Sequence, residues 1–103
     1  MAESQLLLSP LAEADLVEIA LFISDGNPTR ARSFIAELEQ FALTIAATPF
    51  LGRARNELRR GLRSIPFVGY SYTIYYRALP RREGIRVERV LHAARDVERV
   101  FGR

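Results

Sequence analysis

The sequence predicts an α+β domain in which an N-terminal strand and an antiparallel helix hairpin pack on a small antiparallel β-sheet. Two observations support this prediction: apolar residues recur at helical spacing over residues 10–47, whereas from residue 61 onward they alternate with polar residues. Helices grouped first and strands grouped later are typical of α+β folds. The chain has 103 residues, of which 49% are hydrophobic, so we expect one folded domain spanning residues 1–103.

The first elements are a short strand and a helix. The apolar run at residues 5–8 predicts a strand that ends at Ser9. Ser9 can cap the helix that follows, and Pro10 suits its first position, where the missing N–H costs nothing. Apolar residues then share one face up to about Ser24.

The second helix begins after a tight turn at residues 25–28. Asn27 is its expected cap, and Pro28 again occupies the first helical position. Helical spacing continues until Thr48 and Pro49. The short connection predicts that the two helices form an antiparallel hairpin.

Three strands are expected in the second half of the chain. Residues 61–67 form the first, residues 70–78 alternate with period 2 in β-favouring residues, and residues 85–91 form the last. In the last strand Ile85, Val87, Arg89 and Leu91 should share one face, with Arg86, Glu88 and Val90 on the other. The polar turn at residues 80–84 makes the last two strands a hairpin, and the sheet face opposite the helices is expected to remain open for a partner.

The net charge of +3 conceals a strong asymmetry. Residues 1–47 carry two arginines against seven acidic residues, a net charge of −5, whereas residues 48–103 carry thirteen arginines against five acidic residues, a net charge of +8. A positive half attracts acidic partners, either nucleic acid or an acidic protein segment. Lysine and cysteine are both absent, so a disulfide framework and cysteine catalysis are excluded.

No signal sequence or long apolar run is present in these residues, and we expect a cytoplasmic protein with no membrane association. We also expect no metal and no cofactor, because a single histidine without cysteine cannot build a typical zinc site.

His92 is the only histidine and follows the last predicted strand. With Arg63 or Arg95 holding a phosphate, it could act as a general base in RNA cleavage. The alternative is a strand-end histidine that is hydrogen-bonded to neighbouring backbone.

A basic run at residues 53–63 and the aromatic strand at 70–78 are candidates for binding an acidic partner. Guanidinium groups bind both carboxylate and phosphate in two-pronged fashion, so the sequence does not separate an acidic peptide from a phosphate backbone. Among the tyrosines, Tyr72 and Tyr76 are expected in the core, whereas Tyr75 is the better candidate for a contact because it shares a face with Arg77.

Four segments together resemble the ParE branch of the RelE/ParE toxin superfamily. They are LSPLAEADL at residues 8–16, PFLGR at 49–53 with ELR at 57–59 and GLR at 61–63, the aromatic strand at 70–77, and RVLHAARD at 89–96. The resemblance covers nearly the whole chain and implies the toxin of a type II toxin–antitoxin pair. Such a toxin is neutralised by a ParD-like antitoxin whose disordered, acidic C-terminal segment folds over it.

The resemblance implies one of two targets. ParE-type members inhibit DNA gyrase by protein contact and reach DNA only through the antitoxin, whereas RelE-type members cut messenger RNA on the ribosome. Lysine is absent, Ser71 stands where those nucleases tend to carry arginine, and the late aromatic residue Phe101 has no proton to exchange. These departures favour the gyrase inhibitor, while Arg63, His92 and Arg95 remain partial matches to a nuclease site.

The residues expected to bind protein partners fall into two groups. For the antitoxin they are Arg53, Arg59, Arg60, Arg63, Tyr75 and Arg77. For the target they are three residues of the C-terminal tail, Arg99, Phe101 and Arg103.

Overall fold

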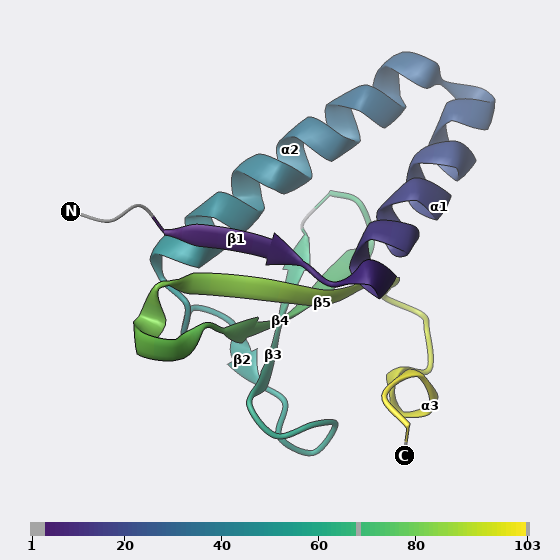
Figure 1. Ribbon diagram of the computed structural model, residues 1–103. Coiled ribbons are helices and arrows are strands. Elements are labelled where there is room, and N and C mark those ends of the chain that lie inside the picture. The colour runs from purple at the N-terminus through teal and green to yellow at the C-terminus, as the bar shows by residue number, and fades with distance from the viewer. Residues whose placement is uncertain (1–3, 68, 103) are drawn as a thin grey trace.

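The computed structural model describes residues 4–67 and 69–102, and it consists of a helix hairpin above a twisted sheet (Figure 1). The elements follow in the order β1 (Gln5–Leu8), α1 (Pro10–Gly26), α2 (Pro28–Ala47), β2 (Arg53–Ala54), β3 (Leu62–Phe67), β4 (Tyr72–Ala78), η1 (Pro80–Arg82), β5 (Gly84–His92) and α3 (Val97–Val100). The predicted α+β class is confirmed, and the two long helices begin at the predicted prolines.

The five strands form one sheet in the order β1-β5-β4-β3-β2. β2 to β5 pair in antiparallel fashion, but β1 runs parallel to β5, with Leu6 opposite Ile85. The sheet is therefore mixed rather than purely antiparallel. The sequence did not reveal this pairing, because β1 joins a strand almost eighty residues away and no local pattern encodes such a contact.

Both helix caps form as predicted. The Ser9 hydroxyl accepts a hydrogen bond from the Ala12 N–H (2.9 Å), and the Asn27 side chain accepts one from the Arg30 N–H (3.0 Å). Ser9 also donates to the Glu88 carbonyl oxygen in β5 (2.7 Å). The cap therefore stabilises the start of α1 and attaches it to the sheet.

The main core lies between the helix hairpin and one face of the sheet. Phe34 of α2 is fully buried and meets the rings of Phe67, Tyr70 and Tyr72 in edge-on fashion, with centroid distances of 5.7, 4.8 and 5.7 Å. Ile74 and the other residues of this face are buried below it. The helical spacing read from the sequence thus corresponds to real burial.

A second, smaller core covers the opposite face of the sheet. It consists of Leu58, Leu62, Tyr75, Leu91 and Phe101, with Val97 and Val100 packed against it. The loop before β3 and the short helix α3 supply its outer layer, on the side away from α1 and α2 (Figure 1). The expectation that this face stays open for a partner is therefore wrong over this area.

A register shift opposite Tyr75 and Tyr76 changes which face of the sheet the later residues of β5 occupy. Tyr75 pairs with Arg89 but Tyr76 pairs with Val87, so Glu88 is an extra residue. Such a bulge breaks the alternation. Val90 consequently joins Val87 in the main core while Leu91 enters the second one, which corrects the predicted grouping of Arg89 and Leu91 with Ile85 and Val87.

Candidate functional site

Four of the five predicted antitoxin-binding arginines lie on β2, on β3 or in the loop between them, at the sheet edge farthest from β1, and Arg77 lies on the neighbouring strand β4. Arg53 lies opposite Ser64, and Ala54 lies opposite Arg63. Arg53, Arg59 and Arg60 are exposed to solvent. We call these three exposed residues the arginine patch.

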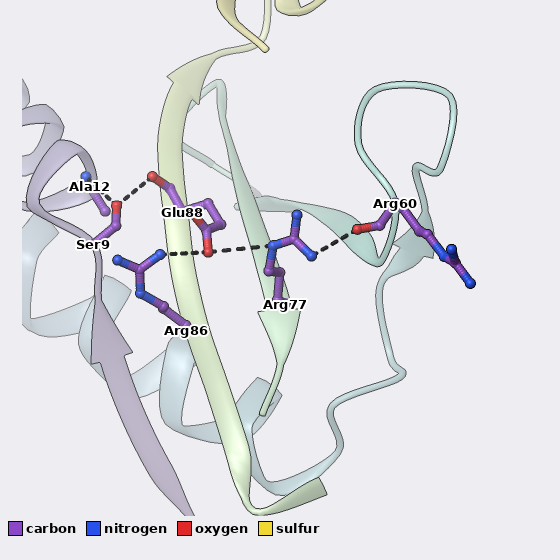
Figure 2. Close-up of polar contacts among 6 residues, drawn as sticks. All are labelled: Ser9, Ala12, Arg60, Arg77, Arg86 and Glu88. Atoms are coloured by element: carbon purple, nitrogen blue, oxygen red, sulfur yellow. Dashed lines mark hydrogen bonds and ion pairs between the residues drawn. The ribbon is translucent and has the colours of Figure 1, made fainter. Parts of the chain in front are cut away.

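Arg77 belongs to an ion-pair network rather than to the free surface. Its Nε lies 3.6 Å from Glu88 Oε2, which also accepts a hydrogen bond from Arg86 Nη1 (2.8 Å). Its Nη1 donates to the carbonyl oxygen of Arg60 (2.8 Å), whereas the Arg60 side chain points away from the network (Figure 2). Because the Glu88 side chain is only 12% exposed, the network mainly attaches the 55–61 loop to the sheet.

Arg55 and Arg59 pack on the second core. Arg55 donates to Glu57 (2.7 Å) and to the Ser64 hydroxyl (3.1 Å), and the hydrogen bond to Glu57 raises the pKa of Arg55. The Arg59 guanidinium lies 5.2 Å from the Phe101 ring centroid. Arg55 therefore has a mainly structural role, whereas Arg59 is exposed to solvent while its guanidinium packs on the Phe101 ring.

Arg63 holds the loop that joins α2 to β2. Its Nη1 donates to the carbonyl oxygens of Gly52 (2.6 Å) and Phe50 (3.4 Å), and its guanidinium lies 4.7 Å from the Phe50 ring centroid. The predicted antitoxin role of Arg63 thus competes with a structural one. Sequence reasoning missed this because the contacts join residues eleven and thirteen positions apart.

Tyr76 supports the same loop from below. Its buried hydroxyl accepts a hydrogen bond from the Gly52 N–H (2.7 Å). A Cβ on Gly52 would lie 2.6 Å from that hydroxyl and 2.8 Å from the Ser64 carbonyl oxygen, so only glycine fits. Burial raises the pKa of Tyr76, although the Gly52 N–H and the charge of Arg63 oppose this effect.

The variant Tyr76→Phe should lower the free energy of unfolding by about 1–3 kcal/mol, because it leaves the Gly52 N–H buried without an acceptor. The pKa of Tyr76 is raised in the folded state. The neutral hydroxyl therefore contributes its full stabilisation below about pH 10, and this stabilisation is lost as pH rises through the folded-state pKa. The difference in free energy of unfolding between the wild type and the variant, measured by urea unfolding, should therefore narrow above about pH 10. The control is Tyr72→Phe, at a half-buried ring. A difference in free energy of unfolding between the wild type and Tyr76→Phe that stays constant at all pH values would contradict the role of the neutral Tyr76 hydroxyl.

Two aromatic residues expected at a partner surface lie in the second core instead. Tyr75 is 4% exposed and Phe101 is 5% exposed, with their ring centroids 5.2 Å apart. The folding back of the segment at α3 buries them in the second core, which corrects the prediction that their rings make outside contacts. Arg99 is exposed on α3, and Arg103 lies outside the described residues.

Of the three partial matches to a nuclease site, Arg63 lies apart from His92 and Arg95. His92 lies opposite Tyr72 while Arg63 lies opposite Tyr76, four residues farther along β4, a separation of about 13 Å along the strand. The His92 Nδ1 accepts a hydrogen bond from the Ala94 N–H (3.1 Å), which is the strand-end arrangement given above as the alternative. Arg95 shares with His92 an open hollow of about 350 Å³ beside α1.

An apolar groove of about 520 Å³ lies between β1, α1 and α2, at the edge opposite the arginine patch. It is lined by Leu6, Leu8, Leu16, Val17, Ala20, Ile35, Leu38, Glu39 and Ala42. A signal for it exists in the sequence, because α1 carries apolar residues outside its buried face. Val17, which lines the groove, is 60% exposed.

Two further observations concern the part of the chain that the structure describes. Within residues 4–67 and 69–102, no group of three His, Asp or Glu side chains is arranged to hold a metal ion. In the same part of the chain, no helix is long and apolar enough to cross a membrane.

Comparisons with known proteins agree with this architecture. The family model for the ParE toxin of the type II toxin-antitoxin system, parDE, matches residues 6–97. Toxin ParE1 from two Mycobacterium tuberculosis strains, CDC 1551 / Oshkosh and ATCC 25618 / H37Rv, is 40% identical over 98 residues, covering 93% of this chain and 96% of the relative.

A solved structure described as a chromosomal ParDE TA system from P. aeruginosa has the same fold. It superposes with a TM-score of 0.71 at 16% identity, covering 87% of this chain and 96% of that one. Together with the family match and the sequence relatives, the observations lead to one conclusion: this chain belongs to the ParE toxin family of type II toxin–antitoxin systems.

Proposed function

We propose that this toxin arrests growth in the cytoplasm by binding DNA gyrase through protein–protein contact, and that a cognate ParD-like antitoxin neutralises it. The toxin itself makes no contact with DNA in this proposal. The observation that carries the choice of target is the separation of Arg63 from His92 and Arg95, because general acid–base cleavage of RNA needs its groups around one phosphate.

Two surfaces suit a single antitoxin segment. The apolar groove fits the apolar face of a helix, and the arginine patch fits the carboxylates of an acidic stretch. The two surfaces lie at opposite edges of a five-stranded sheet, so they are separated by about 19 Å across the strands. An extended segment of about six residues spans this distance, which supports an antitoxin that wraps around the toxin.

Of the residues predicted to bind the antitoxin, Arg53, Arg59 and Arg60 retain that role in the proposal. Arg63 and Arg77 act mainly by holding the neighbouring loops in place. For the target, Arg99 remains as the exposed member of the tail set.

A gyrase supercoiling assay beside a reconstituted translation assay tests the target. We expect the purified toxin to inhibit supercoiling and to leave messenger RNA intact, with inhibition reversed by the antitoxin. The double variant His92→Ala, Arg95→Ala should inhibit as strongly as the wild type, because neither side chain belongs to a reacting site. Unaffected gyrase, together with RNA cleavage that this double variant abolishes, would instead establish the alternative ribosome-dependent endoribonuclease.

A further inference from the structure

The loop between α2 and β2 presents two adjacent large apolar side chains, Phe50 and Leu51, which are 49% and 55% exposed. We propose that this pair, here called the Phe50–Leu51 tip, is the surface with which the toxin binds its protein target. The matching surface on the target is acidic and offers an apolar pocket. This inference rests on the proposed function, action by protein contact, and replaces the buried ring of Phe101 as the aromatic anchor.

The first argument is the rigidity of the tip. The Leu51 N–H donates to the Thr48 carbonyl oxygen (2.9 Å), and the next residue, Gly52, is held by Tyr76 through its N–H and by Arg63 through its carbonyl oxygen. Single exposed apolar residues are common and carry no meaning by themselves. A preorganised pair differs, because it loses little conformational entropy on binding.

The second argument is the charge around the tip. Residues 48–63 contain five arginines and only one acidic residue, Glu57. The Arg63 guanidinium lies against the Phe50 ring, and Arg53 is exposed just beyond Gly52. An aromatic anchor beside arginines is the usual composition of a protein–protein hot spot.

The same arrangement favours a protein over a nucleic acid. Bases stack on open aromatic faces, but a guanidinium already lies against the Phe50 ring, and Leu51 has no ring for stacking. The exposed apolar pair of α1, Leu21 and Phe22, lies in the acidic half of the chain, and Phe22 borders hollows that are lined by acidic side chains as well as by Arg30 and Arg95. It therefore serves as the matched control.

The tip also explains how neutralisation could follow from binding alone. Arg53 belongs to the arginine patch and lies two residues from Leu51. An antitoxin segment on the patch would therefore stand beside the tip and block a large target from reaching it.

The test compares Phe50→Ser, Leu51→Ser with Leu21→Ser, Phe22→Ser. Growth arrest after induction is the first readout, because it does not depend on which target is correct. We expect the tip variant to lose arrest and the control to keep it. Where gyrase is inhibited by the wild type, the concentration for half inhibition should rise about 30-fold for the tip variant alone. Antitoxin affinity, measured by calorimetry, should change by less than about threefold and also reports that the variant is folded.

The outcomes separate the surface from the target. If the wild type leaves gyrase active but the tip variant alone loses growth arrest, the gyrase proposal fails and the assigned surface stands. If the tip variant arrests growth as the wild type does, or loses arrest and antitoxin affinity together, the assigned surface is wrong. A gel-shift experiment in which the wild type binds RNA or DNA and the tip variant does not would also overturn it, in favour of nucleic acid.

Discussion

Replacing Arg53, Arg59 and Arg60 together by glutamate should weaken antitoxin binding about 100-fold at low salt. All three side chains are exposed, and the variant turns three attractions for carboxylates into three repulsions. Salt screens interactions between exposed charges, so the loss should shrink as ionic strength rises. Calorimetric titration with the antitoxin at two salt concentrations measures both effects.

The matched control changes the same charge elsewhere. The variant Arg81→Glu, Arg95→Glu, Arg99→Glu alters the net charge equally but at exposed positions outside the arginine patch. It should bind the antitoxin with nearly wild-type affinity. Equal weakening by both triple variants would show that only the overall charge matters, and this would refute the patch.

Arg63 is left out of the first variant for a structural reason. A charge reversal there would release the carbonyl oxygens of Phe50 and Gly52 and displace the loop. Weakened binding would then report a changed fold as well as a lost contact.

The variant Asp15→Ala should lower the free energy of unfolding by about 3 kcal/mol. The Asp15 carboxylate accepts two hydrogen bonds from Arg89 (2.7 and 2.9 Å) and one from the Val90 N–H (3.0 Å). The Arg89 and Asp15 side chains are only 17% and 13% exposed. Truncation therefore leaves a mostly buried guanidinium without its partner, which costs more than the pair itself contributes.

Urea unfolding followed by circular dichroism measures this loss. The control is Glu13→Ala, an exposed acidic residue of the same helix, which should change stability by about 0.5 kcal/mol or less. Asp15→Asn removes the charge at nearly constant size, and its loss in free energy of unfolding should lie between those of Asp15→Ala and Glu13→Ala. If Asp15→Ala and Glu13→Ala were equally stable, the contact between α1 and β5 would contribute nothing.

The elements that could be predicted from the sequence are those whose signals are local. Ser9 and Asn27 cap their helices as expected because a cap depends on contacts three residues apart. The helix hairpin, the aromatic strand and the last strand could be predicted because apolar residues recur there at helical or alternating spacing within short segments. The family could also be recognised, because its four segments occur in order along the chain.

The candidate site was predictable only as a list of residue types. The sequence determined that arginines concentrate in the second half of the chain. It did not determine which arginines are free to bind, because Arg63 and Arg77 are held by backbone carbonyls that come close only in the folded chain.

Tertiary structure decided the remaining features. The extra residue Glu88 shifts the register of β5, and this single insertion places Val90 rather than Leu91 in the main core with Val87. The return of α3 buries Tyr75 and Phe101, leaving Phe50 and Leu51 beside the arginines. Local patterns determine where helices and strands form, but long-range pairing determines which side chains remain at the surface, since burial depends on what the rest of the chain places over them.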